Sequence, residues 1–100
     1  MPKAFLIAEL TVTDPATYET YRSQVLPTIE AVGGRFVVRG GKRMQVEGVD
    51  ESHHNMLRTV LVEFPSLEIA TAWYHSPAYT TLKNLRMSCS VGRVCIVEGV

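Results

Sequence analysis

The sequence predicts an α+β domain in which a four-stranded antiparallel sheet carries helices on one face. The chain has 100 residues, the usual size of one domain, so we expect a single domain over residues 1–100. Apolar residues alternate with others over 4–12 and 57–64, as they do in strands of a sheet. After the first of these segments, apolar residues recur every three or four positions, which is typical of a helix with one buried face.

The segment after the first strand carries the signals of a helix start and a helix end. Asp14 can accept hydrogen bonds from the first turn, and Pro15 suits the first helical position. Gly33 and Gly34 are typical of a helix C-terminus. Pro27 lies inside this helix and lacks a backbone N–H, so we expect a kink or a local break there. The apolar face consists of Tyr18, Tyr21, Val25, Ile29 and Val32.

The second half of the chain predicts three more strands and two more helical stretches. Residues 35–47 are expected to be extended, with a bulge or bend at Gly40-Gly41, and the polar residues 48–55 to form a loop. Then come a strand over 57–64, a helix over 65–74, a further helix over 76–87 and a last strand over 91–98. This order is the ferredoxin-like βαββαβ arrangement, and it predicts the strand order 4-1-3-2.

Both faces of the predicted sheet are apolar. The face under the helices is expected to carry Leu6, Ala8, Leu10, Phe36, Val38, Val60, Val62, Phe64, Val94 and Ile96. The opposite face, called the open face below, is expected to carry Phe5, Ile7, Val37, Leu57, Leu61 and Val97.

Water would favour polar residues on the open face, and an apolar patch of this kind is seldom exposed on a monomer. We therefore expect a second copy of the chain to cover the open face in a two-fold homodimer. The alternative is a monomer whose loops or C-terminal tail cover this face. Glu9, Arg39 and Glu63 are also expected there, either in ion pairs or around a polar pocket.

Composition and charge exclude several classes of protein. Ten Lys and Arg residues balance ten Asp and Glu residues, whereas nucleic-acid binding depends on an excess of basic residues. No apolar run is long enough to span a membrane, and the first ten residues lack the features of a signal peptide. Two cysteines, Cys89 and Cys95, are too few for a disulfide scaffold. These features predict a reduced, cytoplasmic protein without nucleic-acid or membrane partners.

Several sequence blocks are specific when they are taken together and in order. They are GGRFVVRGG at 33–41, VEFPS at 62–66 and WYHSPAY at 73–79, accompanied by Tyr18-x-x-Tyr21, Leu85-Arg86 and VEG at 97–99. In these blocks the chain resembles the domain-of-unknown-function 1330 family over nearly its whole length. The resemblance implies a dimeric α+β barrel, ferredoxin-like in each subunit, but no activity, because the family's biochemical function is unknown. The chain departs from the family pattern at 51–55 and 87–90.

Three charged residues are the leading candidates for a ligand site. Arg39 and Glu63 are expected on paired strands, and Arg86 ends the last helix. Arginine binds planar oxyanions in a forked geometry, so these residues could orient a small carboxylate or carbonyl compound. They could equally be ion pairs that hold the sheet and the dimer together. With the aromatic residues, which suit either a core or a pocket, the candidate ligand-binding residues are Tyr21, Arg39, Glu63, Tyr74, Tyr79 and Arg86.

Other chemistry finds little support in the sequence. His53 and His54 adjoin acidic residues, but adjacent histidines do not naturally chelate one ion, so no metal site is expected. His75 and Ser76 are neighbours and cannot face each other as a catalytic pair, and Ser76 suits a helix cap. The sequence therefore assigns no catalytic residue.

Two functions remain open at this level. One is a protein that binds a small organic molecule, or acts as a cofactor-free enzyme, in a pocket between the sheet and the helices. Related barrels include monooxygenases without metal or flavin and lactone isomerases, so oxygenase- or isomerase-like chemistry is a fold-level analogy. The other is a structural or interaction module that dimerises and has no catalytic activity. No cofactor is expected in either case.

Overall fold

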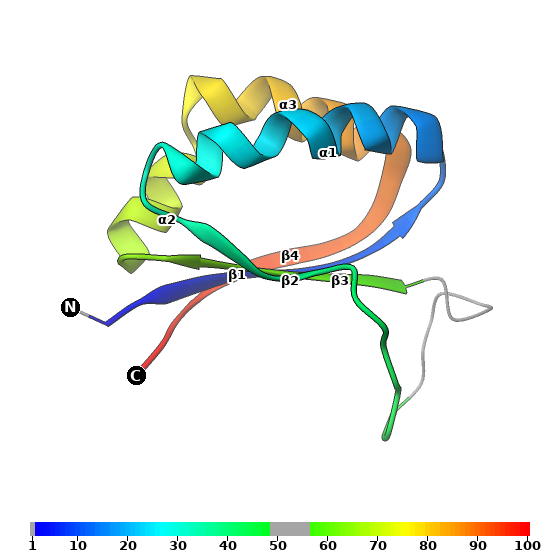
Figure 1. Cartoon of the computed structure of the whole chain (residues 1–100), viewed down its shortest axis with the longest axis horizontal. Coiled ribbons are helices and arrows are strands. Elements are labelled where there is room, and N and C mark those ends of the chain that lie inside the picture. Colours follow the sequence, from blue (N-terminus) through cyan, green and yellow to red (C-terminus); the bar gives the residue numbers. More distant parts are fainter. Residues whose placement is uncertain (1, 49–56) are drawn as a thin grey trace.

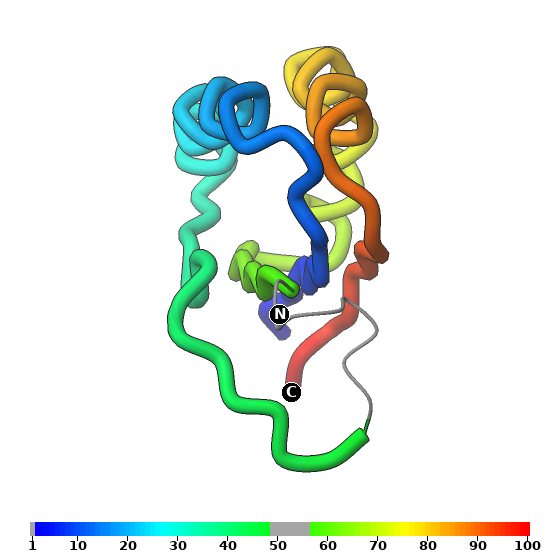
Figure 2. Tube along the Cα trace, turned by 90° about the vertical axis from the view of Figure 1, so that its right-hand side faces the viewer, coloured from blue at the N-terminus to red at the C-terminus, as the bar shows by residue number. Residues whose placement is uncertain are grey.

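A four-stranded antiparallel sheet lies beneath three helices in the computed structural model, which describes residues 2–48 and 57–100 (Figure 1). The elements are β1 (Ala4–Val12), α1 (Pro15–Glu30), β2 (Arg35–Arg39), β3 (Leu57–Phe64), α2 (Leu67–Tyr74), α3 (Pro77–Cys89) and β4 (Ser90–Glu98). The strand order is β2-β3-β1-β4, which confirms the predicted ferredoxin-like topology. All three helices lie on one side of the sheet (Figure 1; Figure 2).

The three helices begin at the caps that the sequence indicates. The Asp14 carboxylate accepts hydrogen bonds from the backbone N–H (3.3 Å) and the hydroxyl (2.6 Å) of Thr17. Ser66 and Ser76 cap α2 and α3 by accepting from backbone N–H groups three residues on. The role predicted for Ser76 is therefore confirmed. Helix α1 continues through Pro27 without a local break and ends at Glu30, before the two glycines.

Strand β2 is much shorter than expected, because the chain leaves the sheet at Gly40. The N–H of Gly40 donates to the Thr59 carbonyl oxygen (2.9 Å), and its φ of +69° turns the backbone away. Residues 41–48 form no strand and pass beneath the sheet, on the side opposite the helices (Figure 1; Figure 2). There the Nε of Arg43 donates to the Thr59 hydroxyl (3.1 Å). The prediction of an extended strand to residue 47 is therefore wrong beyond Arg39.

A β-bulge in β2 changes which residues face the helices. Phe36 pairs with Val62, but Val38 pairs with Leu61 and Arg39 with Val60, so one extra residue is inserted between Phe36 and Val38. Val38 consequently shares the open face with Leu61 and is 37% exposed. Arg39 lies on the helix side. The sequence-based assignment of Val38 to the core and of Arg39 to the open face is wrong, because strict alternation cannot foresee the bulge.

The core fills the space between the helices and the sheet. Phe64 and Trp73 lie at its centre, with ring centroids 5.2 Å apart, and Val94 and Ile96 of β4 are only partly buried. The buried apolar residues of the sheet are Ala4, Leu6, Ala8, Leu10, Val60, Val62 and Phe64, all on the side that faces the helices.

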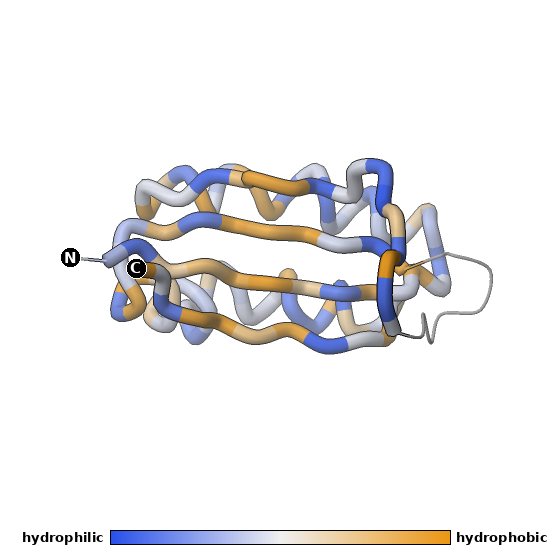
Figure 3. Tube along the Cα trace, turned by 90° about the horizontal axis from the view of Figure 1, so that it is seen from below, coloured by the Kyte–Doolittle hydropathy of each residue, from blue (hydrophilic) through white to orange (hydrophobic). Residues whose placement is uncertain are grey.

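The open face carries a band of apolar residues between charged ends (Figure 3). Val37 and Val97 are 45% and 47% exposed in the single chain. Glu9 is on this face as predicted, and its carboxylate pairs with Arg93 (3.1 Å) and Arg43 (3.9 Å). The Glu9 carboxylate is therefore paired within the subunit.

Two classes of site find no support among residues 2–48 and 57–100. None of the described helices is long and apolar enough to cross a membrane. No group of three or more potential metal ligands gathers in this part of the chain. His53 and His54 lie outside the described residues.

Candidate ligand-binding pocket

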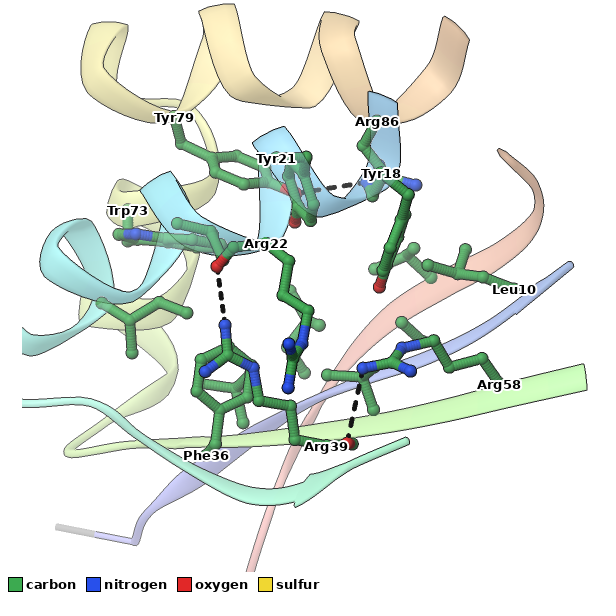
Figure 4. Close-up of a pocket in the computed structure, with 17 residues that line it drawn as sticks. Leu10, Tyr18, Tyr21, Arg22, Phe36, Arg39, Arg58, Trp73, Tyr79 and Arg86 are labelled. Carbon is green, nitrogen blue, oxygen red and sulfur yellow. Dashed lines mark hydrogen bonds between the residues drawn. The ribbon is translucent and has the colours of Figure 1, made fainter. Parts of the chain in front are cut away.

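A cavity lies between α1, α3 and the helix side of the sheet (Figure 4). The cavity has a volume of about 30 Å³. It is therefore small, and long side chains partly fill it. The lining combines an apolar floor with tyrosine and arginine side chains. The lining residues are Leu6, Ala8, Leu10, Tyr18, Tyr21, Arg22, Val25, Ile29, Phe36, Arg39, Arg58, Val60, Val62, Trp73, Tyr79, Arg86 and Val94.

On the helix side of the cavity, two tyrosines and an arginine form a buried hydrogen-bonded chain. The hydroxyl oxygens of Tyr21 and Tyr79 are 3.0 Å apart, and the Nε of Arg86 donates to the Tyr79 hydroxyl (3.3 Å). All three side chains are at least nine-tenths buried. The chain joins α1 to α3 across the top of the cavity (Figure 4).

Burial and close contacts shift the pKa values of Tyr21 and Arg86. It raises the pKa of Tyr21, and the neighbouring Tyr79 raises it further, so Tyr21 keeps its proton at neutral pH. Burial by itself lowers the pKa of Arg86, but interactions with the hydroxyls of Tyr79, Tyr21 and Tyr74 outweigh it, and the net pKa is raised. The upper part of the cavity therefore presents the protonated Tyr21 hydroxyl and one buried cation, Arg86.

On the sheet side, three further arginines converge from α1, β2 and β3 (Figure 4). The Nη2 of Arg39 donates to the Arg22 carbonyl oxygen (2.7 Å), and its guanidinium lies 4.1 Å from the centroid of the Phe36 ring. The Nη2 of Arg58 makes a long hydrogen bond to the Arg39 carbonyl oxygen (3.4 Å), and its guanidinium lies 5.3 Å from the Tyr18 ring centroid. These cations are thus held by carbonyl oxygens and aromatic faces.

The structure brings four of the six predicted site residues together and leaves two outside. Tyr21, Arg39, Tyr79 and Arg86 line the cavity. Tyr74 does not line it but packs behind Tyr79, with ring centroids 5.6 Å apart. Glu63 lies on the open face, away from Arg39, because the bulge turns Arg39 to the other side of the sheet.

Two pocket residues were missed by the sequence reasoning, Arg22 and Arg58. Arg58 alternates with Val60 and Val62 on the helix-facing side of β3. A cation at a core position could therefore have indicated that Arg58 belongs to the pocket. Arg22 follows Tyr21 on α1, and nothing in the helical spacing singles it out.

Glu63 takes part in an ion-pair cluster at the edge of the open face. Its carboxylate accepts a hydrogen bond from the Nε of Arg35 (2.9 Å), and the Nζ of Lys3 is 3.5 Å away. The hydrogen bond from Arg35 lowers the pKa of Glu63, and Lys3 adds to this effect. This arrangement matches the ion-pair alternative that the sequence left open for Glu63.

We expect Glu63→Gln to lower the melting temperature by a few degrees at most at neutral pH, because exposed ion pairs contribute little. A carboxyl group whose pKa is lower in the folded than in the unfolded protein stabilises the fold at pH values above its unfolded-state pKa. This stabilisation is lost as the pH falls through the folded-state pKa. The difference between wild type and variant should therefore close as the pH falls below the ordinary value of 4.5. Thermal unfolding followed by circular dichroism at several pH values tests this. A difference that is independent of pH would contradict it.

The strand order and the helices on one face define a ferredoxin-like α+β domain. The chain belongs to the family described as "Domain of unknown function (DUF1330)", whose sequence model matches residues 3–100. The family resemblance seen in the sequence is therefore confirmed. A comparison with curated proteins finds no significant match.

Solved structures share this fold over almost the whole chain. RPA0582, a protein of unknown function from Rhodopseudomonas palustris, has a TM-score of 0.77 and 15% identity, covering 99% of this chain and 83% of that one. SnoaB, a cofactor-independent oxygenase from Streptomyces nogalater, has a TM-score of 0.65 and 11% identity, covering 100% of this chain and 95% of that one. At these identities the likeness shows the fold alone.

Proposed function

We propose that this protein is a cytoplasmic homodimer that binds a small organic molecule in the pocket between the sheet and the helices. The observation that carries the proposal is the pocket itself, an apolar cavity on which a few buried polar groups converge. Ligand sites in proteins typically combine these two features. Cys89 and Cys95 are both free thiols, which fits a reducing compartment.

The open face supports the homodimer. Its apolar band includes Val37 and Val97, both nearly half exposed in the single chain. Among the described residues only the segment 41–48 crosses this face, and it does so at one end (Figure 3). Most of the band is left for a second copy, and a two-fold axis would bring the same band of each subunit together.

Binding is favoured over catalysis by the chemistry of the lining. The cavity holds no Asp, Glu or His among its described lining residues. Tyr21 keeps its proton because burial raises its pKa, so it is suited to donate a hydrogen bond and poorly suited to act as a base. The cofactor-independent oxygenase SnoaB shares this fold, which leaves cofactor-free catalysis as a second possibility. In such a reaction the bound molecule would have to supply its own reactive group.

Native mass spectrometry of freshly purified protein tests the proposal. We expect a dimer with an additional mass that is lost on denaturation. Val94→Phe should fill the pocket and abolish the additional mass, because Val94 lines the cavity. The matched control is Met87→Phe on α3, where Met87 is 58% exposed and does not line the cavity. A dimer without additional mass that also binds none of the probes named below would favour the structural module instead.

A further inference from the structure

Every polar side chain that lines the cavity can donate hydrogen bonds, and four of them are cations. The cations are Arg22, Arg39, Arg58 and Arg86. Among the described lining residues no carboxylate, amide, imidazole or aliphatic hydroxyl is present to accept their hydrogen bonds. Guanidinium groups cannot accept hydrogen bonds from one another, so within the lining only tyrosine hydroxyls and backbone carbonyl oxygens, such as those of Arg22 and Arg39, accept from them.

Three of these arginines have a buried N–H without a partner in the described structure. The atoms are Nε of Arg22, Nε of Arg58 and Nη2 of Arg86. Arg86 itself is only 6% exposed. Leaving a buried charged donor unpaired is costly, and the cost is recovered when an acceptor occupies the site.

The tyrosine pair adds one more donor without an acceptor. Arg86 donates to the Tyr79 oxygen, and the Tyr21 and Tyr79 oxygens share a single further hydrogen bond. Whichever hydroxyl donates in that bond, the hydrogen of the other one has no acceptor among the described residues. Both residues line the cavity, so the unused hydrogen is available to a molecule inside it.

Like charges crowd the sheet side of the cavity. Burial lowers the pKa of Arg39, and the nearby Arg22 and Arg58 lower it further. Glu19 pairs with the Nη1 of Arg22 at 3.4 Å and partly offsets the effect of these cations on Arg39. The guanidinium groups of Arg39 and Arg58 line the cavity without an ion pair to any described carboxylate.

We propose that the pocket binds a small organic anion, a carboxylate on an apolar body, with the carboxylate held by the arginines of the sheet side and a second oxygen atom reached by the tyrosine hydroxyls. This inference rests on the proposed function, because it names the class of ligand for the same pocket. Arginine matches the planar carboxylate through two parallel hydrogen bonds. The apolar floor, with Phe36 and Trp73, would hold the rest of the molecule. Because the cavity measures only about 30 Å³, the long arginine side chains that partly fill it would have to move aside for a short chain or a single ring.

Matched pairs of acids and primary amides test the inference. Hexanoate with hexanamide, and benzoate with benzamide, keep shape and size while removing the charge. We expect each acid to bind at least about ten times more tightly than its amide, because hydrogen bonds to charged groups are the stronger ones. Calorimetry measures the affinities. Fluorescence of Trp73, the only tryptophan in the chain, reports whether the probe enters the pocket.

Variants at single arginines identify which guanidinium group binds the carboxylate. Arg39→Met removes one cation but keeps a linear apolar stem, so it should weaken acid binding about tenfold or more and leave amide binding nearly unchanged. The matched control is Arg35→Met, on the same strand but outside the cavity, which should leave both unchanged.

The outcomes separate the two proposals. Amides that bind as tightly as acids, with a Trp73 response, would overturn the anion inference and leave small-molecule binding standing. Equal losses in Arg39→Met and Arg35→Met would also overturn it, because the preference would then reflect general charge. Binding of no acid and no amide up to the solubility limit would contradict the proposed function itself.

Discussion

Replacing Gly92 by alanine should destabilise the protein by about 3 kcal/mol or more, and the melting temperature should fall by more than about 12 °C. Gly92 lies on β4 opposite Leu10 and has a φ of +154°, a conformation that L-residues rarely adopt. A Cβ atom built there would clash with the carbonyl oxygen of Glu9. That oxygen belongs to the central strand and cannot move without breaking the pairing of β1 with β4.

Gly41 provides the matched control, because a Cβ atom there meets nothing within 4 Å. Gly41→Ala should therefore change the free energy of unfolding by less than about 1 kcal/mol, and it could be slightly stabilising through the unfolded chain. Thermal and urea unfolding of both variants measure the difference. A Gly92→Ala protein as stable as Gly41→Ala would show that β4 can shift on β1 at little cost.

Placing a charge at the centre of the open face should separate the proposed dimer. Leu61 lies on β3 opposite Ile7 of β1 and Val38 of β2, so Leu61→Asp puts a carboxylate in the middle of the apolar band. In a two-fold interface each substitution occurs twice, and each unpaired buried charge is expensive. We expect the dissociation constant of the dimer to rise by about a thousandfold or more. Analytical ultracentrifugation over a range of concentrations measures it.

Val97→Asp tests the same interface at a position that is 47% exposed in the single chain. Water hydrates the new charge in the monomer, so this substitution should not destabilise the fold. Thr81→Asp on the exposed side of α3 is the control and should remain dimeric. Variants at Leu61 and Val97 that stay folded and dimeric would place the interface elsewhere. A monomeric wild type would contradict the dimer directly.

Most of the fold could be predicted because local signals and periodicity agree. The alternation in β1 and β3, the caps at Asp14, Ser66 and Ser76, and the order of the elements all lead to one topology. The end of β2 was placed too late, because extended residues that leave a sheet look the same in sequence as residues that stay in it. Gly40 marked the change of direction, but not that pairing ends there.

The candidate pocket was only partly predictable. Tyr21, Tyr79 and Arg86 follow from helical faces, because a helix presents residues at regular spacing whatever lies beyond it. Arg39 lines the cavity, but for another reason than the one that made it a candidate, since it was expected next to Glu63 on the open face. The distance between these two residues depends on pairing across strands and on a bulge, and neither leaves a mark in the alternation of a five-residue strand.

The bulge has a consequence for the evolution of such chains. Side chains along a strand alternate between the two faces of the sheet, so the face of each β2 residue depends on its distance in sequence from Phe36. The bulge between Phe36 and Val38 shifts this alternation by one residue. A strand of the same length that paired without the bulge would place Arg39 opposite Thr59 and move its cation from the interior to the surface that we propose joins two subunits. Deletion of Val37 would instead remove the bulge and keep Arg39 opposite Val60. The bulge thus affects ligand preference and assembly together, and relatives that keep the length of this strand but lose the bulge should diverge in both properties.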